Sequence, residues 1–204
     1  MHGACRGRRK GGYWGVPDER SMKLYSYVVE HDDGRAPNPH FGVCTLCRCK
    51  YRKCPTKPRN IVELAERGDW VVGTGGADKR KSAGHAKLVY AMRVDKKLTR
   101  EEYYACPRFK AREDNEMPKD DFQKREQFVL ISRRFYYFGA SAIDIPKKFP
   151  NLEKRGPGFR SDFAPAYIRR FVQWLKEHKP GKHGEPCQKR VDKPRGGKTC
   201  KSSC

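Results

Sequence analysis

The chain has 204 residues and a formal net charge of +22, from 46 Lys and Arg against 24 Asp and Glu. The charge is not confined to the ends, because residues 22–175 hold 32 Lys and Arg against 19 Asp and Glu. Such a balance favours a polyanionic partner, most commonly nucleic acid. No apolar run reaches the roughly 18 residues of a membrane helix, and no secretory signal is visible, so we expect a cytoplasmic protein without membrane contact.

Length and composition predict one domain with basic ends. Residues 1–21 are Gly-rich and basic, with little that could pack, and we expect a disordered extension there. Residues 22–180 form the predicted domain. Residues 181–204 are basic and poor in apolar side chains, which predicts a disordered tail.

The first predicted strand covers residues 23–29. Residues 31–50 follow as a long structured loop, because Pro37 and Pro39 prevent a regular element while apolar residues argue against disorder. A short helix is expected from Asn60, which can cap it together with Glu63, to Gly68.

Two strands, residues 70–72 and 86–94, flank a polar, Gly-rich stretch at residues 73–85. Their order predicts a hairpin-like pair whose connecting backbone can approach a bound group closely. Strict alternation in the second strand would place Leu88, Tyr90 and Met92 on one face. We expect Asp69 to hydrogen-bond backbone at the turn into the first strand, and Trp70 to pack in the core.

The remaining pattern adds a second capped helix at residues 98–104, with Thr99 and Glu102 as its capping pair. Residues 109–125 are charged and aperiodic, which predicts an irregular segment. Residues 128–132 predict a buried strand that continues to Gly139, and residues 167–175 an amphipathic helix. The expected fold is α+β: a small, curved, mostly antiparallel β-sheet or barrel with short helices and a C-terminal amphipathic helix.

Nine cysteines, an odd number without a secretory signal, do not suggest a disulfide framework. Cys44, Cys47, Cys49 and Cys54 lack the separated CxxC pairs of a zinc site, and the His and Cys residues of the tail lack apolar neighbours. We therefore expect no metal and no cofactor. Neighbouring basic residues would favour the thiolate, so Cys44 or Cys49 is a candidate nucleophile.

Several histidines and carboxylates end the first strand or lie in loops. His40 and His85 are expected near the Gly-rich turn, close to His31, Asp32 and Asp33, where acid–base work is possible. The alternative is that these are ordinary polar residues at strand ends.

Six short motifs occur along the chain in a characteristic order. They are Ala36-Pro37-Asn38-Pro39, Cys44-Thr45-Leu46, Cys49-Lys50, Gly68-Asp69-Trp70-Val71-Val72-Gly73-Thr74-Gly75, Leu88-Val89-Tyr90-Ala91-Met92-Arg93-Val94 and Phe138-Gly139. Together they resemble the second type of nucleotide-modification-associated domain, a family of bacteria and their phages. The resemblance covers about residues 22–158 and implies a setting in DNA base modification, not a reaction. Residues 68–104 are more loosely similar to PUA-like folds of the EVE and ASCH types, which take up a modified base in an aromatic pocket.

The first functional hypothesis is a nucleic-acid-linked module that recognises a nucleotide or a modified base, with DNA favoured over RNA. Its pocket would combine the Pro37–Pro39 loop, the 44–50 segment and the glycine-rich turn. In this hypothesis Asn38 and Thr45 read base edges and Phe41 or Trp70 stacks on a base. Phosphate would be held by Lys50, Arg93 and Arg133, and by the backbone of Gly73, Thr74 and Gly75.

Two alternatives stay open. The chain could be an enzyme that modifies a base or nucleotide, with Cys44 or Cys49 as nucleophile and His40 or His85 as its acid–base partner. It could also be a non-specific basic protein that holds nucleic acid through its two tails.

Overall fold

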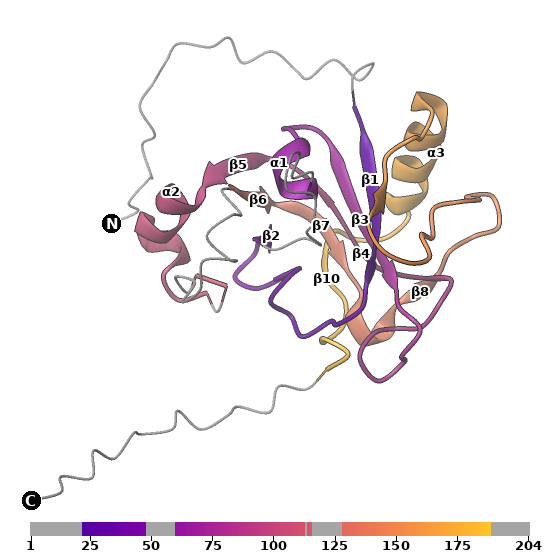
Figure 1. The fold of residues 1–204 in the computed structure, drawn as a ribbon, viewed down its shortest axis with the longest axis horizontal. Helices are drawn as coiled ribbons and strands as arrows, with labels where there is room; N and C mark the ends of the chain where they lie inside the picture. Colours follow the sequence, from indigo (N-terminus) through magenta and orange to yellow (C-terminus); the bar gives the residue numbers. More distant parts are fainter. Residues whose placement is uncertain (1–21, 48–59, 113, 116–127, 189–204) are drawn as a thin grey trace, which may run out of the picture.

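The computed structural model describes residues 22–47, 60–112, 114–115 and 128–188, which form two β-sheets and three α-helices (Figure 1). The larger sheet has the strand order β10-β7-β4-β3-β1-β9, and β8 pairs with β4. Most pairings are antiparallel, whereas β1–β3 and β7–β10 are parallel. Its strands are β1 Leu24–Val29, β3 Trp70–Gly75, β4 Lys87–Arg93, β7 Arg134–Tyr137, β8 Ile143–Asp144, β9 Phe159–Arg160 and β10 Gly181–Lys182.

The smaller sheet has the order β2-β6-β5, formed by Cys44–Leu46, Phe128–Ser132 and Lys96–Thr99. The chain passes between the sheets four times, from β1 to β2, from β2 to β3, from β4 to β5 and from β6 to β7. A hydrogen bond links the last two connections, since the Arg133 amide donates to Asp95 Oδ2 at 2.6 Å. The segment expected as one strand from residue 128 to 139 is therefore divided between two sheets. The α+β class is confirmed, and in the described strands both sheets keep open edges, so the closed-barrel alternative is not confirmed.

The helices are α1 Ile61–Leu64, α2 Arg100–Ala105 and α3 Pro165–Leu175, with 3-10 turns η2 Pro107–Phe109 and η4 Gly139–Ser141. The Asn60 side chain accepts from the Glu63 amide at 2.9 Å, as expected for a cap. At α2, Thr99 Oγ1 accepts from the Glu102 amide while Glu102 Oε2 accepts from the Thr99 amide. These reciprocal bonds form a capping box, so both predicted capping pairs are confirmed. The helices themselves are shorter than predicted, because Leu98 and Thr99 belong to β5 and α1 ends at Leu64, before Gly68.

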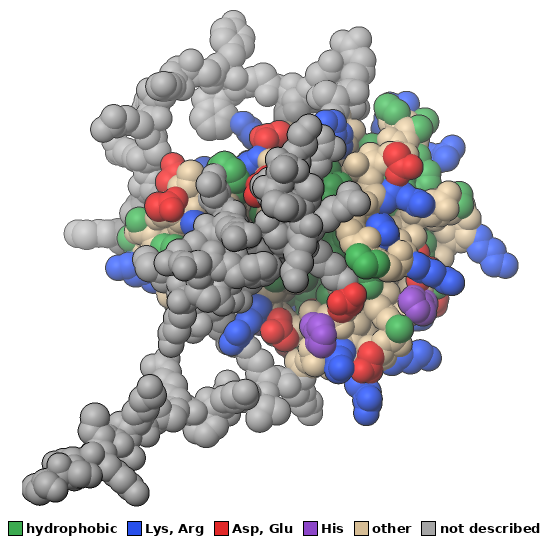
Figure 2. Space-filling view, in the orientation of Figure 1, with side chains coloured by type: hydrophobic (Ala, Val, Ile, Leu, Met, Phe, Trp, Pro, Cys, Tyr) green, Lys and Arg blue, Asp and Glu red, His purple; other side chains and the backbone are tan. Residues whose placement is uncertain are grey.

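The outer surface carries charges of both signs. In Figure 2, Lys and Arg side chains lie around the rim of the described surface with Asp and Glu between them. Of the large hydrophobic side chains in the described residues, only Phe41, 69% exposed, and Leu64, 36% exposed, are open to solvent. No helix in this part of the chain is both long and apolar enough to cross a membrane.

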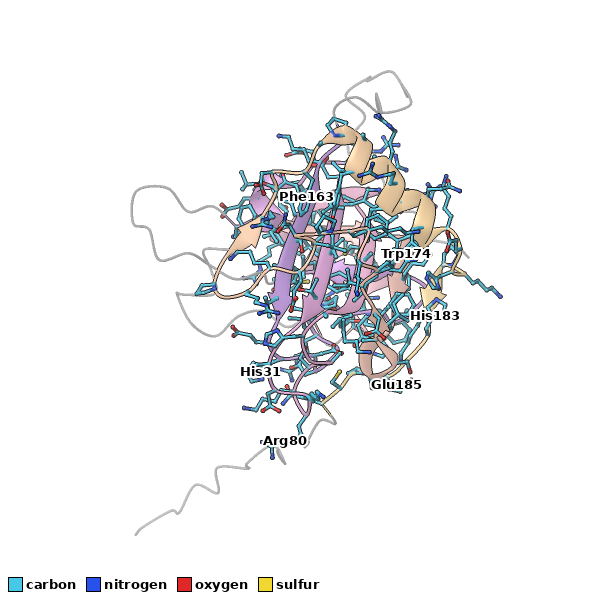
Figure 3. All side chains as sticks on the ribbon, turned by 90° about the vertical axis from the view of Figure 1, so that its right-hand side faces the viewer. His31, Arg80, Phe163, Trp174, His183 and Glu185 are labelled. Atoms are coloured by element: carbon cyan, nitrogen blue, oxygen red, sulfur yellow. The ribbon has the colours of Figure 1, made fainter. Side chains whose placement is uncertain are left out.

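Helix α3 covers one face of the larger sheet and buries Ile168, Phe171, Trp174 and Leu175 against it (Figure 3). Strand β2 and helix α1 cover the opposite face, where a second core contains Leu46, Ile61 and Val62 among others. The predicted C-terminal amphipathic helix is confirmed. The larger sheet is thus buried between two layers, which explains why β3 and most of β4 are inaccessible.

The expected alternation in β4 is wrong at one point. Gly73 pairs with Tyr90 but Thr74 pairs with Leu88, so Val89 is an extra residue opposite the Gly73–Thr74 step. Such a bulge reverses the direction of the side chains that follow. Leu88 consequently packs on the α3 side, whereas Tyr90 and Met92 pack on the β2 side.

Asp69 has the structural role that we expected. Its carboxylate accepts from the Lys23 amide and from the Glu66 amide, both at 2.9 Å. Its backbone carbonyl also accepts from the Val94 amide at 2.8 Å. Asp69 therefore ties the beginnings of β1 and β3 to the end of β4.

The described fold continues beyond residue 180, where the sequence analysis placed the tail. Residues 181–182 pair with β7, the Ala140 amide donates to Glu185 O at 2.8 Å, and the Gln188 amide donates to Asp32 O at 2.9 Å. The predicted extension 1–21 and residues 189–204 lie outside the described residues.

Candidate functional site

A buried arginine organises the loop that leads into β2. Arg112 follows η2, and its side chain is 1% exposed. Its Nη2 donates to Asn38 O at 2.8 Å, to Asn38 Oδ1 at 2.9 Å and to Thr45 Oγ1 at 2.8 Å, while Nη1 donates to His40 O. A guanidinium can donate five hydrogen bonds in a fixed plane, so it holds both sides of this loop at once.

Asp114 is the buried counter-charge of Arg112. Its Oδ1 lies 3.3 Å from Arg112 Nε and accepts from the Tyr103 hydroxyl at 2.8 Å. Its Oδ2 accepts from the Thr45 hydroxyl and from the Cys47 thiol, the latter at 3.2 Å. A buried ion pair is tolerable only when its remaining hydrogen-bonding groups are satisfied, as they are here. We call Asn38, Thr45, Cys47, Tyr103, Arg112 and Asp114 the Arg112 cluster.

One polar group of the Arg112 cluster is left without a partner. Asn38 is fully buried, and its Nδ2 has no hydrogen-bond acceptor within the described part of the chain. Leaving a buried donor unsatisfied costs about 1–3 kcal/mol. Groups of this kind in native proteins call for an explanation, and one explanation is a ligand acceptor that is absent from the free protein.

Phe41 stands at the tip of the loop that Arg112 holds. Its backbone has φ +57°, a left-handed conformation that is uncommon for a bulky residue. The ring centroid lies 6.4 Å from that of His40, and 69% of the residue is exposed. The fold thus displays a large aromatic side chain at the surface, next in the chain to His40, whose carbonyl accepts from the buried Arg112.

A second buried polar group lies at the end of β1. Asp32 Oδ1 accepts from the Tyr137 hydroxyl at 2.5 Å, and Oδ2 accepts from the Cys187 amide at 3.2 Å. Burial raises the pKa of Asp32 above its ordinary value of 3.8, although both hydrogen bonds oppose the shift. Asp32 therefore connects the end of β1, the end of β7 and the C-terminal segment.

The raised pKa of Asp32 predicts a pH effect on stability. The folded protein holds the proton on Asp32 at pH values where the unfolded chain has lost it, so this group lowers stability as pH rises from about 4 through its raised pKa. We expect the melting temperature of Asp32→Asn, relative to that of the parent, to rise through this window and then level off. Melting curves of both proteins from about pH 3 to 8 check this. A difference that stays constant with pH would contradict it.

The candidate catalytic residues are not assembled into one site. Cys44 is fully buried, and burial raises the pKa of its thiol, which disfavours a nucleophilic thiolate. Burial, followed by the charges of Lys182 and Arg112, lowers the pKa of His40. His85 is exposed, and its Nδ1 lies 3.0 Å from Glu153 Oε1. The contacts of the described residues do not bring His40 and His85 together, and Cys49 lies outside them.

The glycine-rich segment is used by the protein itself. A side chain on Gly73 would lie 2.3 Å from the Tyr90 ring, and one on Gly75 would lie 1.9 Å from Gly84 O. The Thr74 hydroxyl donates to Tyr27 O at 3.2 Å. The three predicted binding residues of this segment, Gly73, Thr74 and Gly75, are all buried. The groups that come close to the glycine backbone are therefore parts of the protein itself, the Tyr90 ring and the Gly84 backbone.

The predicted residues Trp70, Arg93 and Arg133 lie at the opposite end of β4 from the glycine-rich turn. Trp70 is 1% exposed and stacks on Tyr136 at 6.4 Å, which fits its expected core position. It pairs with Arg93 at the end of β4 that leads into β5. Seven residues of β4 separate this end from the glycine-rich turn, about 20 Å at the usual rise per residue. Arg133 is exposed beside the same end, and Lys50 lies outside the described residues.

Two further findings concern the cysteines. In the described segments, no three His, Cys, Asp or Glu side chains gather as metal ligands would. Cys44, Cys47 and Cys187 are free thiols, whereas Cys106 is disulfide-bonded. The disulfide at Cys106 differs from the expectation that the composition gave.

The comparisons with known proteins give one match. A family model described as nucleotide modification associated domain 2 matches residues 21–118 and 110–193, well over half of the chain. No curated protein and no solved structure matches, so the looser similarity to PUA-like folds is not confirmed. The family match covers the loop of Phe41, the Arg112 cluster and helix α3. The chain therefore belongs to the nucleotide modification associated domain 2 family.

Proposed function

We propose that this chain recognises a base or nucleotide in nucleic acid, within the setting of nucleotide modification that its family indicates. The observation that carries the proposal is Phe41, an exposed aromatic ring on a loop fixed from beneath by Arg112. The partner that we propose is DNA, and the setting is the cytoplasm of a bacterium or of a phage-infected cell.

Phe41 would stack on a base. Base–aromatic stacking is tolerant of sequence, since every base presents a flat face, and contributes about 1–3 kcal/mol per base. A ring that is already held in place loses less conformational entropy when it stacks on a ligand. Three hydrogen bonds from Arg112 Nη2 hold Asn38 and Thr45, and the backbone of Asn38 pairs with that of Thr45 at 2.9 and 3.0 Å.

Asn38 would supply the hydrogen bond that distinguishes one base edge from another. Its Nδ2 has no acceptor among the described residues, whereas its Oδ1 accepts from Arg112. A carbonyl oxygen or ring nitrogen of a base would satisfy this donor. Because Asn38 is buried, the side chains that cover its Nδ2 must move to admit a base edge, while the Asn38 backbone stays bound to Arg112. The Thr45 hydroxyl already contacts Arg112 and Asp114, so we assign it to positioning the loop.

Replacing Phe41 with Ala should weaken binding of the full chain to DNA about 5- to 150-fold, which corresponds to loss of one stacked base. The measurement is fluorescence anisotropy with matched duplexes that carry unmodified and hypermodified bases, across a salt series. We expect a preference for one base form that persists at high salt, because stacking and base contacts do not depend on counterion release.

Leu64→Ala is the matched control, since Leu64 is the other exposed large hydrophobic in the described residues and lies on α1. It should bind as the parent does. Asn38→Asp keeps the oxygen that Arg112 contacts but removes the free donor, so it should reduce the preference between base forms. Equal affinities of the Phe41→Ala protein and the parent, with no preference for either duplex, would show that this loop does not read bases.

A further inference from the structure

A strongly basic layer lies on the side of the larger sheet that α3 covers. We call residues 145–180 the α3 layer; they contain nine Lys and Arg against three Asp and Glu. Two of the three acids already have partners, because Glu153 contacts Arg155 and His85, and Asp162 contacts Arg160. The right-hand edge of Figure 2, where Figure 1 places α3, shows Lys and Arg side chains pointing outward.

The exposed face of α3 presents cations that the described residues leave unpaired. Its apolar residues face the sheet, whereas Arg169, Arg170 and Lys176 are exposed. Arg169 and Lys176 lie two helical turns apart, about 10 Å along the axis and on nearly the same side. That spacing is too wide for one small anion but suits a row of phosphates, which carry one charge about every 3.4 Å along each DNA strand.

Two further lysines extend this surface beyond the helix. Lys147 and Lys148 are exposed and directly precede Phe149, which packs against Phe171 and Trp174 at 5.6 and 5.4 Å between ring centroids. Phe149 therefore anchors the two lysines beside α3. The cations of the α3 layer come from separate segments that the fold has brought to one surface.

The composition of this surface favours nucleic acid over a lipid membrane. Peripheral membrane helices insert exposed apolar side chains between the lipids. The α3 layer contributes none of the exposed large hydrophobics in the described residues. Phe163 and Tyr167 are only partly open and stack on each other at 5.0 Å. The layer thus offers charge without an inserting side chain.

We propose that the α3 layer binds the phosphate backbone of a nucleic-acid polymer without reading its sequence. This inference rests on the proposed nucleic-acid partner and adds that the substrate is a polymer, not a free nucleotide. The loop of Phe41 leads into β2, which covers the opposite face of the larger sheet from α3. Base reading and backbone binding are therefore separate functions, on different surfaces, that mutations can separate.

The test compares two variants of the full chain with equal changes of charge. One is Arg169→Glu/Arg170→Glu/Lys176→Glu; the control is Lys79→Glu/Lys96→Glu/Lys110→Glu, at exposed lysines outside the α3 layer. Their affinities for single-stranded and duplex DNA of about 20 nucleotides are measured between about 50 and 200 mM salt. The corresponding Gln variant of the α3 residues avoids introduced repulsion, and circular dichroism confirms that each protein is folded.

We expect the α3 variant to bind both DNAs about tenfold or more weakly and to lower the salt slope by about three, because three phosphates would no longer be neutralised by the protein. The control should change little. The preference between modified and unmodified bases should survive in the α3 variant and be reduced in Asn38→Asp, which separates failure of this inference from failure of the base-reading proposal. Equal losses of affinity in the two charge variants would overturn the inference. Binding of the α3 variant to phosphatidylserine vesicles is measured as well. If this variant loses vesicle binding but binds DNA as the parent does, the inference is also overturned.

Discussion

Replacing Arg112 with Met should destabilise the protein by about 3–5 kcal/mol, because it leaves Asp114 as an uncompensated charge in the interior. Asp114 is 3% exposed, so little solvent is available to replace the guanidinium. The same change removes the donors to Asn38, Thr45 and the His40 carbonyl. Natural domains are stable by only about 5–15 kcal/mol, so the loss amounts to a large share of the total. The measurement is the free energy of unfolding in urea.

Arg108→Met is the control, because Arg108 lies in the same segment but is exposed, with its guanidinium carbon 5.9 Å from the centroid of the Phe109 ring. Its cost should stay below about 1 kcal/mol. The double variant Arg112→Met/Asp114→Leu should cost less than the sum of the two single changes, because it removes both charges together. An Arg112→Met protein within about 1 kcal/mol of the parent would show that the ion pair does not hold the loop.

This cluster is the part of the candidate site that sequence patterns did not reveal. Arg112 and Asp114 belong to a charged, aperiodic stretch, and charged residues are usually exposed. What buries them is a set of partners about 70 positions earlier, Asn38 and Thr45, which lie near neither residue in the sequence. The only local sign was that the 31–50 loop contained enough apolar residues to be ordered, and the structure confirms that order for its described part, residues 31–47.

Elements that depend on neighbouring residues were predicted well. The caps at Asn60 and Thr99, the buried run of β6 and the apolar stripe of α3 each arise from spacing within a few residues. The bulge at Val89 could not be predicted from the sequence of β4. A bulge arises where the partner strand, here β3, has one residue fewer, and no residue pattern in β4 marks that position.

The structure also separates residues that the predicted site combined. Trp70 and Gly75 are five positions apart, which made a shared pocket plausible. In a strand, however, five residues extend about 17 Å, so they lie near opposite ends of β3. Arg93 and Arg133 lie at the Trp70 end, and Arg133 directly follows Ser132, which pairs with Cys44 of β2. Nearness in sequence thus indicated nearness in space only within turns and helices.

Replacing Gly75 with Ala should cost about 3 kcal/mol, at the upper end for overpacking, because the new methyl group would meet backbone and not a movable side chain. It would lie 1.9 Å from Gly84 O and 2.9 Å from the Gly84 carbonyl carbon. The loop that must shift is held from both ends, since the Gly76 amide donates to Ser82 Oγ at 2.9 Å and the Asp32 amide to Lys81 O at 2.8 Å. Urea unfolding of the full chain measures the cost.

Gly156→Ala separates this clash from the general effect of losing a glycine. Gly156 has φ +77° with nothing within 4 Å of the added carbon, so its replacement should cost only about 1–2 kcal/mol of backbone strain. The two variants also distinguish between roles for the glycine-rich segment. If Gly75 serves packing, as its burial indicates, folded Gly75→Ala protein keeps the affinity of the parent for DNA. If the segment instead cradles a phosphate, affinity falls while the free energy of unfolding changes no more than in Gly156→Ala.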